Sequence, residues 1–283
     1  MSSAELNVGL CLTSGQVFRW SRNASDVWTG VDGPNWFRIL QLEERLIVET
    51  NGQTSDLERF FQLHLSARDV IHSILSAGPE LEPYLGFGRG LRVLRYADPV
   101  ECLFTFLCSA NNHVPRISAM VRHLATLGPP LEGLAEQRRF PGVERLAAVT
   151  EEELRSAGFG YRAASLPKVA ALLRERGGDA YVWSLQDAEY EEARDELISL
   201  PSVGPKLADC IALFGLGFGE SVPVDTHIWK AATRIYFPNY AGLSLTPQKY
   251  EEFATFFKKR FGANAGWAHQ ALFYEGLLNW RSR

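Results

Sequence analysis

A segment dense in helix breakers, Leu200-Pro-Ser-Val-Gly-Pro-Lys206, separates two helical patterns and constrains the fold more than any other feature. We predict one helix over 187–199, which the prolines and glycine of the segment end, and a second over 205–215. Pro205 suits the first position of the second helix, because the N–H group that proline lacks would have no partner there. The second helix then begins with free N–H groups and a positive dipole end, which together suit a phosphate.

Lys206 stands in an unusual place for a cation, the first turn of that second helix. A positive charge there opposes the helix dipole, and apolar neighbours penalise the charged form further. Both effects favour the neutral amine, which is a nucleophile. The simpler alternative is a solvated lysine or one that contacts a phosphate. Cys210, one turn later on the same helical face, favours the catalytic interpretation.

Asp225 lies nineteen residues after the lysine, in Val222-Pro-Val-Asp-Thr-His227, and is predicted to cap a helix over 225–235. An N-cap aspartate needs no catalytic role. The N–H groups of a cap also keep the carboxylate ionised, and an ionised carboxylate can stabilise a positively charged transition state. Both roles are therefore compatible. His227 either donates to a phosphate or makes a local hydrogen bond, and we interpret Asp209 as a structural hydrogen-bonding residue.

The composition is that of an ordinary soluble globular protein, with 283 residues, 46% hydrophobic and 22% charged. No apolar run approaches the roughly 20 residues that cross a bilayer, and the first residues resemble neither a signal peptide nor a transit peptide. We therefore expect no membrane association and a cytoplasmic location, near the nucleoid in a bacterium. The four cysteines lack the spacing of a zinc site or a disulfide framework.

The net charge of −4 is unlike that of many nucleic-acid-binding proteins, which are strongly basic. Residues 1–89 contain 7 Lys and Arg against 11 Asp and Glu, a net −4, whereas residues 90–283 contain 22 of each. A nucleic-acid-binding face would therefore be a local cluster, supported by helix N-termini as well as by basic side chains.

Two regions of different periodicity predict an α+β protein. Residues 16–50 are rich in Val, Ile, Phe and Trp with breaks at hairpin spacing, and two or three short helices follow between 56 and 77. Gly86-Phe-Gly-Arg-Gly90 is the predicted boundary. A small antiparallel sheet domain, residues 1–89, would then pack on a larger all-α domain, residues 90–283. The expected strands are 16–22, 27–31, 35–42 and 45–50, and the further helices are 98–110, 114–127, 142–149, 150–157, 162–176, 246–260 and 264–279.

The segment 200–227 resembles the helix-hairpin-helix motif of DNA glycosylases, specifically the bifunctional branch with a catalytic lysine in the hairpin and an aspartate beyond it. Further segments resemble the 8-oxoguanine DNA glycosylase/AP lyase family, in the same order along the chain. They are Ser14-Gly-Gln-Val-Phe-Arg-Trp20, the segment 98–112, Gly158-Phe-Gly-Tyr-Arg162 and Ala265-Gly-Trp-Ala-His-Gln-Ala-Leu-Phe273. A hairpin alone occurs in many DNA-binding proteins, whereas a lysine, an aspartate and four collinear segments are specific.

The resemblance implies a reaction for this pair of residues. Lys206 would attack C1′ of a flipped nucleoside, expel the base and form a Schiff base, after which β-elimination cuts the strand. Asp225 would face the developing oxocarbenium ion. The family implies no cofactor and, because no cysteine follows Cys210, no iron–sulfur cluster, although a structural cation at the hairpin is compatible with it. The expected partner is duplex DNA with an oxidised purine, bound by a monomer.

The resemblance also implies how the flipped base is read, by stacking on its faces and hydrogen bonds to its edge. Phe273 and Cys210 would enclose the faces. The Gly15 carbonyl would accept from N7–H, the donor that distinguishes 8-oxoguanine from guanine. The simpler interpretations are a core aromatic for Phe273 and an ordinary turn for Gly15.

Other positions match the family's contacts with the rest of the duplex. Tyr161 would stack into the gap that the base leaves, with Asn111 in the same wedge, and Arg116 and Arg162 would donate to the orphaned cytosine. The simpler interpretation of Asn111 is a helix C-cap. The expected phosphate contacts are Val203, Gly204 and His227.

Three positions depart from the family's pattern. Ser202 replaces the first hairpin glycine, and since a non-glycine adopts positive φ only at a cost, the hairpin is expected to differ slightly. His113 stands where close relatives tend to have another asparagine. His269 replaces a glutamine that reads the Watson–Crick edge. Histidine ordinarily titrates near neutrality, so we expect binding to weaken as the pH falls, unless Gln270 or another residue reads the edge.

Two other functions compete with this interpretation. A monofunctional alkyl-base glycosylase of the same fold would keep the aspartate without the lysine. A non-catalytic hairpin module would need neither residue, nor the segments at 14–20 and 265–273. Borohydride trapping distinguishes all three, because only an imine-forming enzyme becomes covalently attached to DNA.

Overall fold

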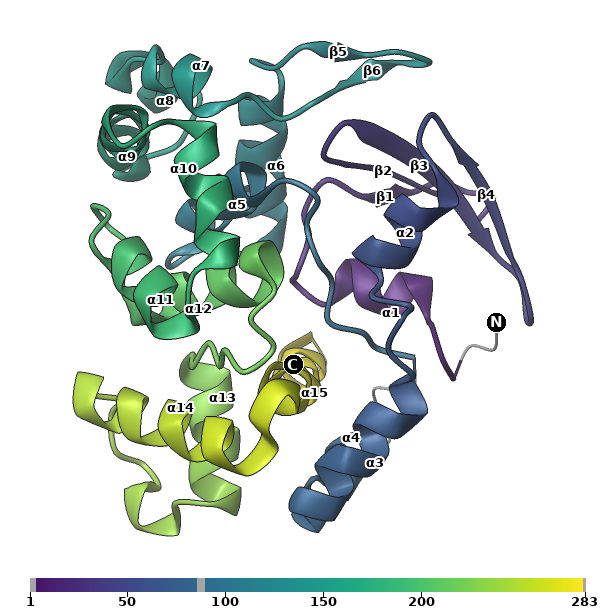
Figure 1. Ribbon diagram of the computed structural model, residues 1–283, viewed down its shortest axis with the longest axis vertical. Coiled ribbons are helices and arrows are strands. Elements are labelled where there is room, and N and C mark those ends of the chain that lie inside the picture. Colours follow the sequence, from purple (N-terminus) through teal and green to yellow (C-terminus); the bar gives the residue numbers. More distant parts are fainter. Residues whose placement is uncertain (1–3, 86–89, 282–283) are drawn as a thin grey trace.

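The computed structural model describes residues 4–85 and 90–281 and has the predicted α+β architecture, a small sheet beside a larger set of helices (Figure 1). The sheet is antiparallel and its strands are adjacent in chain order, so each is joined to the next by a hairpin connection. These strands are β1 (Ser21–Arg22), β2 (Trp28–Asp32), β3 (Asn35–Gln41) and β4 (Leu46–Thr50). The predicted strands therefore form, the first of them much shorter than expected.

The expected strand over 16–22 is wrong for its first five residues. Residues 16–20 are all buried, and the Gln16 side chain binds the backbone at residues 92–94, so this stretch packs in the interior instead of joining the ladder. A short helix that we did not predict, α1 (Val8–Thr13), precedes it. Its N-cap, Asn7, accepts from the Leu10 N–H, and an asparagine before an apolar run was the available signal.

The short helices expected between 56 and 77 are α2 (Thr54–Phe60) and α3 (Ala67–Ala77), and a further helix that we did not predict, α4 (Glu82–Leu85), follows them. The predicted boundary at 86–90 lies outside the described residues except for Gly90, so the division of the chain at residue 89 stays a prediction.

The rest of the chain is mostly helical, as predicted. The α-helices are α5 (Pro99–Ser109), α6 (Val114–Ala125), α7 (Val143–Ala147), α8 (Glu151–Ser156), α9 (Arg162–Glu175), α10 (Asp179–Ser184), α11 (Tyr190–Ile198), α12 (Pro205–Ile211), α13 (Thr226–Ile235), α14 (Pro247–Phe261) and α15 (Ala265–Arg281). Residues 212–216 continue α12 as a π-helical segment. Single 3₁₀ turns occupy Pro79–Leu81, Leu185–Asp187, Pro238–Tyr240 and Gly262–Asn264.

Two elements of this region were not predicted. Helix α10 lies in a stretch to which we assigned no element, and α11 begins three residues later than expected, after a 3₁₀ turn. The second element is a hairpin of β5 (Pro130–Leu131) and β6 (Leu134–Arg138), which is too short for a periodic pattern. It is fixed by tertiary contacts, since Leu131 packs with Val31 and Trp36, and the Trp36 indole donates to the Glu132 carbonyl at 2.9 Å.

One hydrophobic core runs through both parts of the molecule and positions α5 and α15 at its centre. Residues 99–108 of α5 are buried on every side, as expected of a helix that is apolar all round. The buried Arg19–Glu101 ion pair, 2.9 Å long, ties the N-terminal segment to this helix. In Figure 1, α15 (yellow) runs between the helical body and the N-terminal part. The N-terminal part and the helical part of the molecule are therefore packed on the same central helices.

Candidate active site

A turn joins α11 to α12, as predicted. Pro205 occupies the first turn of α12, and Gly204 is its N-cap. Ser202 has φ +65°, the left-handed conformation that glycine adopts freely, so this turn carries a cost in backbone strain; the expected difference from the family's hairpin stays a prediction. The Ser202 hydroxyl bonds the Ser165 hydroxyl of α9 at 3.1 Å, which anchors the turn to the neighbouring helix.

Asp209 fixes the two hairpin helices relative to each other, which confirms its structural interpretation. It is fully buried, and its carboxylate accepts from the Tyr190 hydroxyl and the Arg194 guanidinium of α11, each at 2.8 Å. The Tyr250 hydroxyl of α14 donates to the same carboxylate. Three helices therefore converge on one buried charge, one residue away from Cys210.

Lys206 and Asp225 approach the same space from two helix N-termini. Lys206 is half-buried on the first turn of α12, with its Nζ 5.9 Å from the centre of the Phe106 ring. Asp225 is the N-cap of α13, and its Oδ1 accepts from the backbone N–H groups of His227 and Ile228 at 2.8 and 2.9 Å. The predicted cap is confirmed.

A small pocket, about 30 Å³ in volume and open to solvent, brings the predicted residues together. Its lining contains Lys206 and Asp225 with all the residues assigned to reading the base. Phe106, Phe214 and Pro223 also line it, and the first two rings stack at 5.5 Å beneath the site. The apolar pattern of their segments did not separate these three residues from ordinary core. The complete lining is Gly15, Phe106, Lys206, Cys210, Phe214, Pro223, Asp225, His269, Gln270 and Phe273.

Gly15 and Phe273 are neighbours in the wall of the cavity. Gly15 has φ +81°, and a Cβ on it would lie 3.3 Å from Cε1 of Phe273, so both conformation and space favour glycine. Phe273 is half-buried and meets His227 edge to face. Burial raises the pKa of the Cys210 thiol to about 11, although the charge and hydrogen bond of Lys206 lower it. The thiol is therefore a protonated, apolar wall of the cavity.

His269 is a buried, uncharged lining residue. It is 3% exposed and lies nearly parallel to Phe273, with ring centres 6.2 Å apart. Burial lowers the pKa of the imidazole to about 4; Lys206 lowers it further, while Asp225 and a hydrogen bond to the Pro223 backbone raise it. Titration near neutrality was therefore the wrong expectation. Within the described part of the chain, Nδ1 is buried and has no hydrogen-bond partner, so a ligand could reach it only after the ring or its neighbours move.

Gln270, the alternative edge reader that we considered, also lines the cavity, and this role stays a prediction. It is 2% exposed, and its Nε2 donates to the Ser14 carbonyl at 3.4 Å. The amide nitrogen is thus directed at the turn that carries Gly15.

The predicted wedge residues gather at the junction of α5, α6 and α9. Asn111 is exposed with φ +47°, and Tyr161, 56% exposed, donates its hydroxyl to the Ala110 carbonyl at 3.0 Å. Arg116 is exposed and donates to Gly158. Arg162 differs, since it is 3% exposed beneath the Tyr161 ring and donates to the Ala110 carbonyl. Of the two arginines, Arg116 is the one already placed to meet a ligand.

The predicted phosphate contacts lie on the two helix N-termini. Gly204 is exposed, with open space where a Cβ would stand, and His227 is half-buried on the first turn of α13. The Val203 N–H already donates to the Leu200 carbonyl at 3.2 Å. All three assignments stay predictions, and that of Val203 requires its amide to leave this carbonyl.

Neither a metal cluster nor a membrane span is found among residues 4–85 and 90–281. Groups of three or more His, Cys, Asp or Glu side chains that could hold a metal do not occur there. None of the helices in this part of the chain has the length and apolar character to cross a membrane. The structural cation considered at the hairpin stays a prediction.

Family models match almost the whole chain. Residues 1–103 match the N-terminal domain of 8-oxoguanine DNA glycosylase, and residues 104–256 match the HhH-GPD superfamily of base excision DNA repair proteins. The chain is 36% identical to the N-glycosylase/DNA lyase OGG1 of Arabidopsis thaliana over 98% of this chain and 79% of that protein. It is 29% identical to the N-glycosylase/DNA lyase of Saccharomyces cerevisiae, over 96% and 84% of the two chains.

A solved structure supports the same conclusion. The 8-oxoguanine glycosylase/lyase of Clostridium acetobutylicum, in complex with double-stranded DNA containing cytosine opposite to 8-oxoG, superimposes with a TM-score of 0.86 at 26% identity, over 97% of this chain and 93% of that one. The chain belongs to the HhH-GPD superfamily of base excision DNA repair proteins and, within it, to the 8-oxoguanine DNA glycosylase family. It is a DNA glycosylase with DNA lyase activity, which excludes the monofunctional and non-catalytic alternatives.

Proposed function

We propose that this enzyme removes 8-oxoguanine opposite cytosine from duplex DNA by flipping the lesion into the cavity around Lys206. The observation that carries the proposal is the shared cavity, whose lining includes Lys206 and Asp225 together with Gly15, His269 and Phe273. A nucleoside held there would present its sugar to the lysine and its base to the other residues.

Lys206 supplies the nucleophile in this proposal. Its neutral amine attacks C1′ as the bond from C1′ to the base breaks, and the base leaves with that electron pair. The resulting amine adduct opens to a Schiff base, and loss of a C2′ proton then eliminates the 3′ phosphate. The hydrogen bonds that Asp225 accepts at the N-terminus of α13 support an ionised carboxylate, which stabilises positive charge developing on the sugar.

The cavity residues divide the reading of the base among them. Phe273 offers a ring face for stacking, and Gly15 offers a backbone carbonyl to N7–H. Once the ring or its neighbours move, the unpartnered Nδ1 of neutral His269 can accept from a donor on the Watson–Crick edge, which guanine-type bases have at N1 and N2. A neutral histidine can therefore replace the family's glutamine as an acceptor.

Arg116 supports the proposed preference for cytosine. Its guanidinium has donors only, which suits the O2 and N3 acceptors of an orphaned cytosine, and it is exposed beside Tyr161. Arg162 would join it only after leaving the Ala110 carbonyl.

The proposal is tested by incision of duplexes that carry 8-oxoguanine opposite each of the four bases. Excision should be fastest opposite cytosine. Arg116→Ala should lower the ratio of the rates opposite cytosine and opposite adenine by roughly tenfold, the value of one good polar contact to a base. Arg122→Ala, an exposed arginine on the same helix, is the matched control. Equal rates opposite cytosine and adenine in the wild type would refute the opposite-base preference.

A further inference from the structure

The turn Ser14-Gly15-Gln16 is held from two sides by buried glutamine side chains. Gln16 is 1% exposed, and its Nε2 donates to the Ser14 hydroxyl at 2.8 Å and to the Arg92 carbonyl at 2.9 Å. Its Oε1 accepts from the Leu94 N–H at 2.8 Å. Both the nitrogen and the oxygen of the Gln16 amide are thus hydrogen-bonded, to the turn and to the 92–94 segment.

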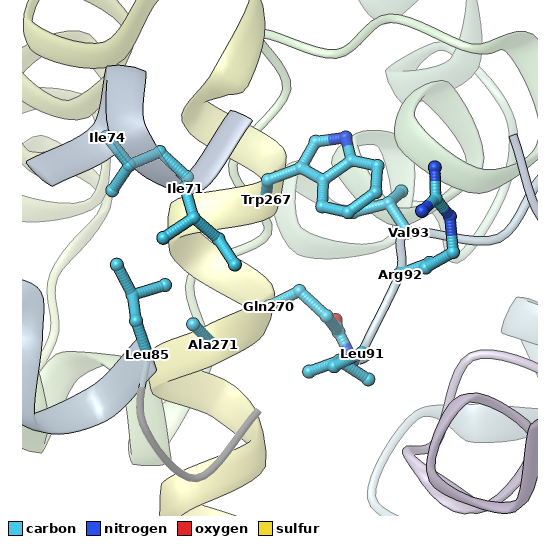
Figure 2. A pocket seen from close by; sticks show the side chains of 9 residues that line it. All are labelled: Ile71, Ile74, Leu85, Leu91, Arg92, Val93, Trp267, Gln270 and Ala271. Atoms are coloured by element: carbon cyan, nitrogen blue, oxygen red, sulfur yellow. The ribbon is translucent and has the colours of Figure 1, made fainter. Parts of the chain in front are cut away.

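Gln270 contacts the same turn from α15. Its Nε2 donates to the Ser14 carbonyl, the group immediately before Gly15 in the chain. The side chain lines the base cavity and also a second, mostly apolar cavity on the other side, formed with Ile71, Leu91 and Trp267. Figure 2 shows Gln270 reaching from α15 toward Leu91, the start of the segment that Gln16 binds. A buried amide beside an apolar cavity depends on the partner it has, because alternatives are few.

We propose that Gln270 is a positioning residue for base selection, which acts by fixing the Ser14–Gly15 peptide so that the Gly15 carbonyl faces the flipped base. This inference rests on the proposed function. The carbonyl can only distinguish 8-oxoguanine from guanine if its direction is set before the base arrives, since a hydrogen bond depends steeply on angle. Gln16 holds the turn from the chain's own side, and Gln270 holds it from the helix that carries His269 and Phe273. The Gly15 carbonyl and the Phe273 ring are thereby held in a fixed arrangement relative to each other.

The test is Gln270→Met, which removes the amide donor at similar side-chain volume. Single-turnover excision of 8-oxoguanine opposite cytosine should fall by roughly threefold to tenfold, as expected for one neutral hydrogen bond. Cleavage of a duplex with a preformed abasic site should stay at the wild-type rate, because that substrate has no base for Gly15 to contact. Ala271→Val is the matched control, since Ala271 lines the second cavity from the next position of α15 without lining the base cavity; both of its rates should stay unchanged.

The two substrates make the outcomes distinguishable. An equal fall on both in Gln270→Met would mean a general structural role, and no fall on either would mean that the contact is dispensable; each result overturns the inference. Ala271→Val reproducing the selective loss would also overturn it. A wild-type enzyme that cleaves abasic DNA without releasing 8-oxoguanine would contradict the proposed function itself, and the inference with it.

Discussion

The active-site cavity has two sides that are built in different ways. The proposed catalytic side, defined here as Lys206 and Asp225, comes from two helix N-termini within twenty residues of chain. The recognition side, defined as Gly15, His269 and Phe273, joins a turn near the N-terminus to the last helix. Local capping and hairpin rules position the catalytic side, whereas only the packing of distant segments creates the recognition side.

The departures from the family's pattern differ between the two sides as well. Lys206 and Asp225 stand where the pattern places them. On the recognition side His269 replaces a glutamine, and the neighbouring Gln270 binds the Ser14 turn. We therefore expect changes on the catalytic side to remove or greatly slow the reaction, and changes on the recognition side to alter the reading of the base. The predictions below, from the largest effect to the smallest, test that division.

Lys206→Gln should abolish borohydride trapping and strand cleavage on both 8-oxoguanine and abasic duplexes, since glutamine forms no imine. Binding of the lesion duplex should be largely retained. Gel analysis of trapped complexes measures the loss of trapping, and a binding titration measures the affinity for the lesion duplex. Lys230→Gln, which changes an exposed lysine on α13, is the control and should trap normally. Undiminished trapping by the first variant would remove Lys206 from the mechanism.

Asp225→Asn should lower turnover by roughly two or more orders of magnitude, as for other preorganised electrostatic groups. The melting temperature should change little, because asparagine caps a helix nearly as well as aspartate. Single-turnover kinetics and thermal unfolding give both values on one preparation. Near-normal turnover would leave capping as the whole role of this residue and would weaken the contrast between the two sides.

His269 should make the protein less stable in acid without changing the chemistry. Burial lowers the pKa of its imidazole to about 4, so between pH 6.5 and 4 the unfolded chain binds more protons than the folded one. The free energy of unfolding should therefore fall as the pH drops through this window, by up to about 3 kcal/mol.

His269→Gln should flatten that acid dependence and keep excision nearly constant from pH 5.5 to 8. Burial raises the pKa of Asp32 to about 6 and that of Glu101 to about 7, but both carboxyls titrate in both proteins and cancel in the difference. Denaturant unfolding at several pH values measures the effect. Parallel curves for the two proteins would mean that His269 is not held neutral by burial.

Ser202→Gly should be more stable than Ser202→Ala by about 1 kcal/mol, because both variants lose the hydroxyl contact with Ser165 and only glycine relieves the left-handed strain. Ser202→Ala is the matched control; it keeps the strain, loses the hydroxyl contact with Ser165 and should lower stability by a similar amount. Denaturant midpoints compare them. An alanine variant as stable as the glycine variant would show that strain at this residue is not the governing effect.

Much of the fold could be predicted because its elements are strongly periodic or clearly capped. The helix predicted over 98–110 begins at Pro99, and the helix predicted from the Asp225 cap begins at Thr226. The hairpin β5–β6 and helix α10 could not be predicted, since neither has enough residues to show a period. The strand expected at 16–20 failed because side-chain hydrogen bonds to the 92–94 segment replaced a ladder.

The hairpin, the lysine at its helix N-terminus and the aspartate cap could be read from local sequence, because they depend on interactions between near neighbours. The electrostatic state of His269 and the burial of Arg162 became clear only in the folded molecule, because burial and charge partners come from segments far away in the chain. The tertiary structure also decided that Gln270 binds Ser14, a contact across 256 positions. Local rules fix the backbone position of a side chain, whereas long-range packing fixes its solvent exposure, its partners and therefore its chemistry.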